Sequence, residues 1–209
     1  MADGACFIQA RPAVAVLFAR CDSVYKSDPR CDVYDIDRDA RTWLGGMPVV
    51  AHPPCRSWSR MRTFAKPRPG ERDLAVWAID QVRRFGGVLE HPSGSALFRE
   101  LALPRPGSTD RDSFGGWVMP VSQKWWGHRA EKRTWLYIVG ADPSSIPAFP
   151  LSLGEAERVC GLWSGRDRSR ARKEIGPAER EHTPPALALW LVDLAASTAV
   201  DSIQAVRHG

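Results

Sequence analysis

Short apolar runs separated by polar turns dominate the hydrophobic pattern of this chain. Most of the runs are rich in valine, isoleucine and leucine and are bounded by Gly, Pro, Asp or Ser, which is typical of buried strands. Between several of them the apolar period lengthens to three or four residues, so strands alternate with helices and the fold class is α/β. Strands are predicted over residues 14–19, 31–36, 48–52, 86–90, 116–121 and 134–139.

Helices are predicted where this longer period coincides with a start signal. Residues 71–85 follow Pro69-Gly70, open with acidic residues and repeat apolar side chains on one face. Residues 184–197 open at Thr183, an N-cap followed by proline in the first turn. A shorter helix is expected near 94–101.

Composition indicates one globular domain. The chain has 209 residues, 44% of them hydrophobic, which suits a single domain over 1–199 with a tail over 200–209. No apolar stretch is long enough to span a bilayer and the N-terminus lacks a signal-peptide pattern, so we expect no membrane partner and a cytoplasmic monomer. The five cysteines are scattered and odd in number, which indicates a reducing compartment rather than a disulfide framework.

The most informative segment runs from Val49 to Ser59, where a short strand meets Pro53-Pro54 and Cys55 follows directly. Two prolines force a rigid, extended exit from the strand. The thiol then lies at the strand's carboxyl end, where open α/β sheets bind ligands. This favours a nucleophile over the alternative, an inert buried cysteine. His52 lies nearby, but no second pair of metal ligands accompanies it, so no metal site is expected.

A carboxyl group occupies the same kind of position on a second strand. Glu90 ends the strand over 86–90 and is followed by His91-Pro92. If the two strands are parallel neighbours, Cys55 and Glu90 face one crevice, a pair suited to attack on an activated ring. The alternative is a solvated carboxylate without a catalytic role.

These residues resemble the catalytic segments of the DNA cytosine-C5 methyltransferases, especially small phage-type members. Pro53-Pro54-Cys55 resembles the loop whose cysteine adds to C6 of the pyrimidine, and Glu90 resembles the glutamate that hydrogen-bonds the base near N3. The resemblance implies a Rossmann-like methyltransferase sheet with helices on both faces. It also implies that Cys55 and Glu90 are catalytic, with Pro54, Arg56 and Ser57 as substrate contacts.

Two later segments extend this resemblance over about residues 45–195. The run from Trp126 to Gly140 resembles the basic segment before a late strand of the family, although the Gln-x-Arg-x-Arg pattern is not reproduced. Residues 181–188 resemble the opening of the final helix. The substrate contacts implied by the basic segment are His128, Lys132 and Arg133.

The part of the family that binds S-adenosylmethionine is only half present. The first strand is followed by Arg20-Cys21-Asp22 instead of the glycine-rich turn that lets the cofactor approach the backbone. The cofactor residues implied by resemblance are Phe18 and, for the ribose, Asp35 or Asp37, with a capping or turn role as the alternative for the acids. The segment before the Cys55 strand is short, so one strand–helix unit of the fold is expected to be missing.

Positive charge gathers between the late strand and the final helix. Lys and Arg number 29 and Asp and Glu 24, a net charge of +5, which suits a polyanionic partner. The basic insert over 141–183 stands where the family carries its recognition domain and leaves a very small target-recognition region. We expect it to contact DNA phosphates with relaxed sequence specificity, the alternative being a solvated loop. The predicted contacts are Arg166, Arg168, Arg170, Arg172 and Lys173.

Together these features predict an enzyme that modifies C5 of a pyrimidine, most simply cytosine, in the DNA of a bacterial or phage-infected cell. A thiolate that adds to C6 makes C5 nucleophilic, and Arg56 or Arg60 is expected to lower the thiol pKa. Methyl transfer from S-adenosylmethionine is the first hypothesis. The same adduct with a methylene folate, or used for deamination, is the second, and a catalytically silent DNA-binding protein is the third.

Overall fold

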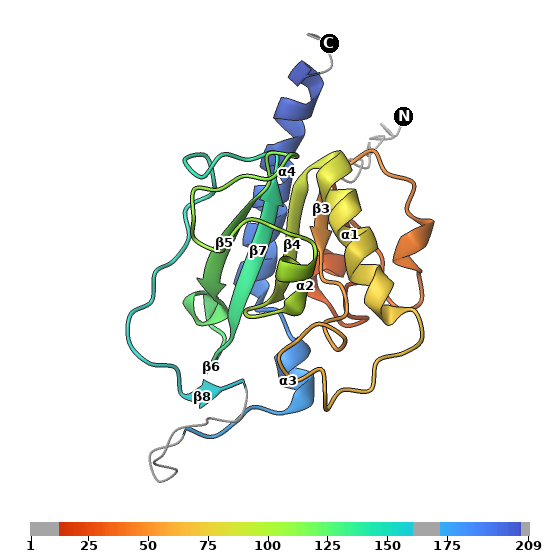
Figure 1. Cartoon of the computed structure of the whole chain (residues 1–209). Helices are drawn as coiled ribbons and strands as arrows, with labels where there is room; N and C mark the ends of the chain where they lie inside the picture. Colours follow the sequence, from red (N-terminus) through yellow and green to blue (C-terminus); the bar gives the residue numbers. More distant parts are fainter. Residues whose placement is uncertain (1–12, 161–171, 206–209) are drawn as a thin grey trace, which may run out of the picture.

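The computed structural model describes residues 13–160 and 172–205, which form a six-stranded, mostly parallel sheet between helices (Figure 1). The strand order is β2-β1-β3-β4-β7-β5, in which the first four strands are parallel and β7 runs antiparallel to β4 and β5. The strands are β1 (Val14–Leu17), β2 (Cys31–Val33), β3 (Val49–Ala51), β4 (Gly87–Pro92), β5 (Trp117–Ser122) and β7 (Arg133–Val139). A separate two-stranded sheet joins β6 (Ala130–Glu131) to β8 (Arg158–Val159).

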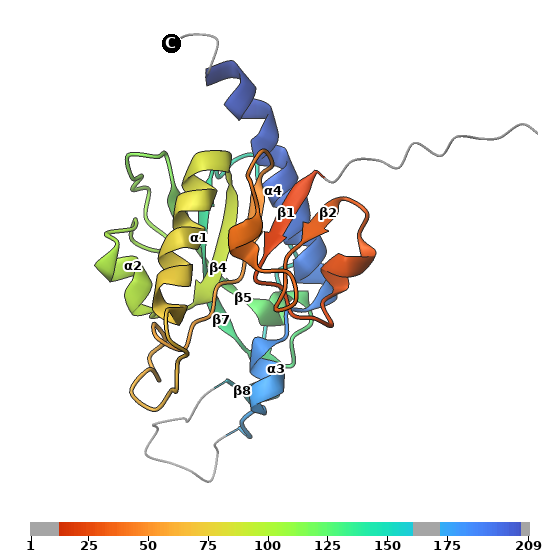
Figure 2. The same ribbon diagram turned by 90° about the vertical axis from the view of Figure 1, so that its right-hand side faces the viewer.

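Helices cover both faces of the sheet, as Figure 2 shows in side view. α1 (Glu71–Phe85) and α2 (Ala96–Glu100) pack on one face, and α4 (Pro185–Ala205) packs on the other. α3 (Pro177–Glu181) lies below the lower edge of the sheet in Figure 1. Three short 3-10 helices complete the fold: η1 (Val24–Ser27), η2 (Ala40–Thr42) and η3 (Gln123–Trp126).

The central strands begin as continuous apolar runs because both of their faces are buried: β1 and β3 are apolar throughout, and β4 is apolar up to Glu90. On β4, Leu89 faces α1 and Val88 faces α4, and on β3 Val49 and Val50 divide in the same way. This two-sided burial explains why the strands appear in the sequence as continuous apolar runs rather than alternating ones.

The α/β class and the six main strands are confirmed, with differences at element ends. β2 ends at Val33 rather than residue 36, because the Asp35 side chain accepts the amides of Asp37 and Arg38 and turns the chain out of the sheet. The expected tail from residue 200 is wrong in its first part, since α4 continues to Ala205. Between β2 and β3 the described chain forms only η2.

None of the helices in the described part of the chain has the length and apolar character that crossing a membrane requires. Within the same residues the cysteine thiols are free: Cys21, Cys31, Cys55 and Cys160.

Candidate active site

The carboxyl ends of the parallel strands define the candidate site. β1 has β2 on one side and β3 on the other, so the strand order reverses between β1 and β3. Open α/β sheets bind their ligands outside the strand ends at such a point. The amide of His52 donates to the carbonyl of Leu17 at 3.0 Å, which holds these two ends together. The segments after β1, β3 and β4 meet at the lower edge of the sheet in Figure 1, next to α3.

Cys55 lies on the turn directly after β3, where the sequence places it. Its carbonyl accepts the amides of Trp58 (3.0 Å) and Ser59 (2.8 Å), which closes a tight turn on the cysteine. The Trp58 ring is buried, and its indole N–H donates to the carbonyl of Arg72 at 3.0 Å. A buried anchor three residues further on therefore fixes the position of the partly exposed thiol.

The electrostatic surroundings of Cys55 differ from the expected ones. Burial and the negative charge of Glu90 raise the pKa of the thiol, and the positive charge of Lys132 opposes them only in part. Arg56 makes a bidentate ion pair with the buried Glu71, at 2.8 Å to 3.1 Å. The expectation that Arg56 or Arg60 lowers the thiol pKa is therefore wrong, and Lys132 is the cation that acts on the thiol.

Glu90 is the centre of a buried hydrogen-bond network. One carboxylate oxygen lies 3.0 Å from Nδ1 of His52, whose Nε2 lies 2.9 Å from the Tyr25 hydroxyl. The other accepts from the Gln123 side-chain amide at 3.0 Å, and this amide also donates to the Thr134 hydroxyl at 3.1 Å. With Nδ1 of His52 as donor and Nε2 as acceptor, the hydrogen bonds from Tyr25 through His52 to Glu90 are all satisfied, whereas Oε1 of Gln123 is buried without a partner among the described residues.

This network keeps Glu90 ionised. Burial alone raises the pKa of a carboxyl group, but the hydrogen bond from His52 and the charge of Lys132 outweigh it and lower the pKa of Glu90 to about 2. In this state Glu90 accepts hydrogen bonds and carries no proton to donate. A role as proton donor to a base requires that a bound substrate first displace one of these partners.

His91 points to the opposite face of the sheet and is fully buried. Neither of its ring nitrogens has a hydrogen-bond partner among the described residues. Burial lowers the pKa of His91 to about 4, against the opposing effects of the Glu90 charge and the Pro54 carbonyl. The imidazole is therefore neutral at physiological pH, and it packs beneath the turn that carries Cys55.

His91 predicts a loss of stability in mild acid. The pKa of His91 is near 6.5 in the unfolded chain and about 4 in the folded protein. The stability that depends on the neutral imidazole is therefore fully present above pH 6.5 and is lost as the pH falls to 4. This loss amounts to about 3 kcal/mol in the free energy of unfolding. We expect His91→Leu to remove this part of the pH dependence in urea unfolding measured between pH 7.5 and 4.5. A buried His128 titrates in the same direction and remains in both proteins. An unchanged pH slope in the variant would contradict the assignment.

The remaining expected substrate contacts divide into two groups. Pro54 and Ser57 flank Cys55 on its turn and are partly exposed beside it. Arg56 is engaged by Glu71 in an ion pair. Sequence alone gives no means to foresee this pairing, because Glu71 lies at the start of α1, on the far side of the loop.

The basic segment before β7 contributes one group to the site. The Lys132 ammonium donates to the carbonyl of His182 at 2.9 Å, and its charge acts on both Cys55 and Glu90. Arg133 pairs with Glu131 at 2.7 Å and is largely exposed. His128 is buried and bound to the backbone of Ala130, so it supports the fold of this segment.

The expected cofactor residues do not form the site that the resemblance implies. The Asp35 carboxylate is occupied by the Lys26 ammonium and by two backbone amides. Phe18 has a left-handed φ of 62° and packs edge-on against Trp77, so the turn after β1 is tight although no glycine is present. Arg20 extends over this turn to Asp22 and to the carbonyl of Ala178 in α3. Of the two acids only Asp37 is exposed, and these residues do not fit S-adenosylmethionine.

Three of the five predicted phosphate contacts, Arg166, Arg168 and Arg170, lie outside the described residues. Arg172 donates to the carbonyl of Ala156 at 2.7 Å and approaches Glu131, while Lys173 is exposed.

In the described part of the chain, no group of three His, Cys, Asp or Glu side chains could hold a metal ion. Comparison with protein families, curated proteins and solved structures finds no match to this chain.

Sequence reasoning missed most of the Glu90 network. From the sequence His52 is apparent only as an isolated metal-ligand type, although it directly precedes Pro53-Pro54 and Cys55. Tyr25 and Gln123 lie on 3-10 helices with no distinctive pattern. Their contacts arise only when β1, β3, β4 and β7 are assembled, so the sequence carries no local signal for them.

Proposed function

We propose that this protein modifies C5 of a pyrimidine base in DNA, with Cys55 as the nucleophile. The observation that carries the proposal is that Cys55 follows β3 while Glu90 lies on the neighbouring parallel strand β4, directly after the last residue paired with β3. The charges of Glu90 and Lys132 both reach the thiol. A nucleophile, a carboxylate and a cation thus share one edge of the sheet.

The chemistry follows from these three groups. The Cys55 thiol gives its proton to solvent and the thiolate sulfur bonds to C6 of the base, which ends the aromaticity of the ring and makes C5 nucleophilic. Lys132 favours the thiolate electrostatically. Once a bound base has displaced one of the Glu90 partners, the Glu90 carboxyl group takes up a proton and donates a hydrogen bond to the ring where negative charge develops. After C5 has bonded to an electrophile, loss of the C5 proton expels the thiolate and restores the ring. A base inside a duplex is out of reach of the thiol, so the target is flipped out or unpaired.

The chemical nature of the modified nucleoside will identify the carbon donor. S-adenosylmethionine is the donor that the resemblance implies and a methylene folate is the alternative, but the contacts of Asp35 support neither. We therefore assign no residue of this chain to a donor. The proposal includes that the protein acts on this DNA in the cytoplasm of a bacterial cell.

Nucleoside mass spectrometry of DNA from cells that express the wild type or Cys55→Ser tests this function. We expect a modified pyrimidine nucleoside with the wild type and none with the variant. A methyl-sized gain indicates S-adenosylmethionine, a hydroxymethyl-sized gain indicates a folate, and new deoxyuridine indicates deamination. The exposed Cys21 provides the matched control, because Cys21→Ser should leave the product unchanged. DNA identical in all three strains would contradict the proposal.

A second function, a catalytically silent DNA-binding protein, is favoured by two observations. The pKa of the Cys55 thiol is raised, and both oxygens of the Glu90 carboxylate are already hydrogen-bonded within the protein. This alternative predicts DNA binding that is the same for the wild type and Cys55→Ser, without any altered nucleoside.

A further inference from the structure

The connection between β3 and α1, residues 56–70, carries an unusual distribution of charge, and we refer to it as the cationic loop. Arg56 at its start is neutralised by Glu71. Four further cations follow that form no ion pair with another described residue: Arg60, Arg62, Lys66 and Arg68. In the neighbouring β6–β7 segment Arg129 pairs with Glu179 and Arg133 with Glu131, while Lys132 binds only the carbonyl of His182. Uncompensated positive charge is thus concentrated on the loop that begins at Cys55.

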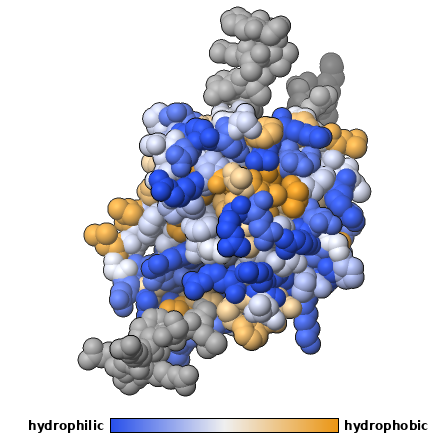
Figure 3. Space-filling view, viewed as in Figure 1, coloured by the Kyte–Doolittle hydropathy of each residue, from blue (hydrophilic) through white to orange (hydrophobic). Residues whose placement is uncertain are grey.

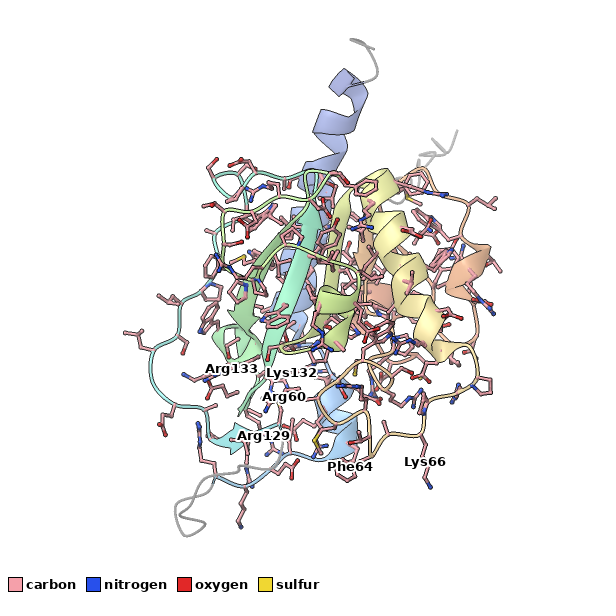
Figure 4. All side chains as sticks on the ribbon, viewed as in Figure 1. Arg60, Phe64, Lys66, Arg129, Lys132 and Arg133 are labelled. Atoms are coloured by element: carbon pink, nitrogen blue, oxygen red, sulfur yellow. The ribbon has the colours of Figure 1, made fainter. Side chains whose placement is uncertain are left out.

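A large aromatic side chain lies among these free cations. Phe64 is 81% exposed and Met61 is 45% exposed, so the apolar tip of the cationic loop is in contact with solvent. Consecutive turns hold it there, since the amide of Phe64 donates to the carbonyl of Met61 at 3.0 Å. Figure 4 shows Phe64 and Lys66 at the lower side of the molecule, with Arg60 close to Lys132 and Arg133 at the strand ends.

A cavity adjoins the loop on the same edge of the sheet. It has a volume of about 590 Å³ and lies between the loop, the turn after β4, and strands β5 and β7. Arg60 and Arg133 line it together with the rings of Trp125 and Trp135. Ser122 also lines the cavity, but its hydroxyl is buried, and Glu131 lies in the lining beside Arg133 and pairs with it. The cavity therefore offers flat aromatic rings next to Arg60, a cation that forms no ion pair with another described residue.

This combination selects the chemistry of the partner. Free cations match a chain of phosphates, and exposed aromatic rings match the faces of unpaired bases, which is how proteins bind single-stranded nucleic acids. A duplex hides its base faces in the stack. An anionic membrane matches the charge, but one exposed Phe on a series of turns lacks the amphipathic helix that interfacial binding requires. Figure 3 shows hydrophilic side chains over much of the lower half of this face.

We propose that the cationic loop and the adjoining cavity bind single-stranded DNA, with one base stacked on Phe64, a second in the cavity and the phosphates on the loop cations. This inference rests on the proposed function in one respect: the bound DNA strand would lead to Cys55. It assigns the substrate as an unpaired strand, and it moves the main DNA contact from the 165–173 run to the loop after β3.

Fluorescence anisotropy of a labelled oligodeoxycytidine of about 16 nucleotides tests the proposal, with Cys55→Ser as the background so that no chemistry occurs. We expect Phe64→Ala to weaken binding about tenfold or more, with an unchanged dependence on salt. Arg60→Gln should instead reduce the slope of log K against log salt by about 0.7. The matched controls are Leu44→Ala, which removes an apolar side chain that is 98% exposed, and Arg84→Gln on the far end of α1. Both controls should bind like the parent.

Several outcomes would overturn the proposal. These are a Phe64→Ala variant that binds as tightly as Leu44→Ala, a duplex that binds as well as the single strand, or protein retained by anionic phospholipid vesicles but not by the oligonucleotide. Unchanged unfolding temperatures show that the variants are folded. If binding depends on Phe64 but no C5 chemistry is found, the proposed function is refuted while the proposed DNA-binding surface remains supported. C5 chemistry with Phe64-independent binding would refute the surface alone.

Discussion

Replacing Glu90 with alanine is expected to lower the free energy of unfolding by about 3 to 5 kcal/mol. The substitution leaves the His52 Nδ1–H and the Gln123 amide buried without the acceptor that each has at 3.0 Å. An unsatisfied buried donor keeps its full desolvation cost, so the loss exceeds the net value of the two hydrogen bonds. Urea unfolding at pH 7 measures the difference from the wild type.

Glu100→Ala is the matched control, because it removes a carboxylate from an exposed ion pair with Arg72. We expect that variant to lose less than about 1 kcal/mol. The dependence of the free energy of unfolding on acidic pH provides a second check. The pKa of Glu90 is about 2 when folded and near 4.5 when unfolded, so its contribution is present above pH 4.5 and disappears as the pH falls to 2. This window lies below that of His91. A Glu90→Ala loss as small as that of Glu100→Ala would contradict the described network.

Gly87→Ala is expected to prevent folding or to lower the free energy of unfolding by more than about 4 kcal/mol. Gly87 begins β4 with a φ of +113°, and a Cβ built on it would lie 2.0 Å from the carbonyl oxygen and 2.5 Å from the amide nitrogen of Val49. Neither backbone atom can move without breaking the pairing of β3 with β4. Because these two strands carry Cys55 and Glu90, the candidate site would be lost with the sheet.

Gly70→Ala is the control that separates the steric clash of a new Cβ from the strain of a positive φ. Gly70 also has a positive φ, +73°, but nothing lies within 4 Å of the Cβ position. Its substitution should cost only about 1 to 2 kcal/mol. Circular dichroism and urea unfolding of the two variants provide the comparison. If Gly87→Ala were no less stable than Gly70→Ala, the close approach of β4 to β3 would be wrong.

The sequence predicts where the strands lie along the chain better than it predicts which strands pair and in which direction they run. Continuous apolar runs mark β1, β3 and β4 because both faces of these strands are buried, and the prolines after β3 place Cys55 at the edge. The antiparallel insertion of β7 between β4 and β5 leaves no local signal, since an apolar run is compatible with either direction. The same holds for β6 and β8, which contain two residues each.

The sequence predicts the two central members of the candidate site, but neither the rest of the Glu90 network nor the electrostatics of the site. The positions of Cys55 and Glu90 follow from two strand ends. Their pKa values depend on groups that approach from elsewhere in the fold, such as Lys132 for the thiol. Arg56 shows the opposite case, because its proximity in sequence suggested a role that its ion pair with Glu71 prevents. Proximity along the chain therefore predicts which residues share an edge, while the ion pairs depend on the assembled fold.

Hydrogen exchange at C5 tests the central claim most directly, because it needs no carbon donor. Single-stranded DNA is incubated with the protein in D2O, and the pyrimidine nucleosides are analysed by mass spectrometry. Addition of Cys55 to C6 lets C5 take up deuterium, and loss of the original proton with expulsion of the thiolate leaves the label in the base. We expect deuterium at C5 with the wild type and with Cys21→Ser, and none with Cys55→Ser. Equal labelling with Cys55→Ser, or none with the wild type, would contradict a Cys55 adduct.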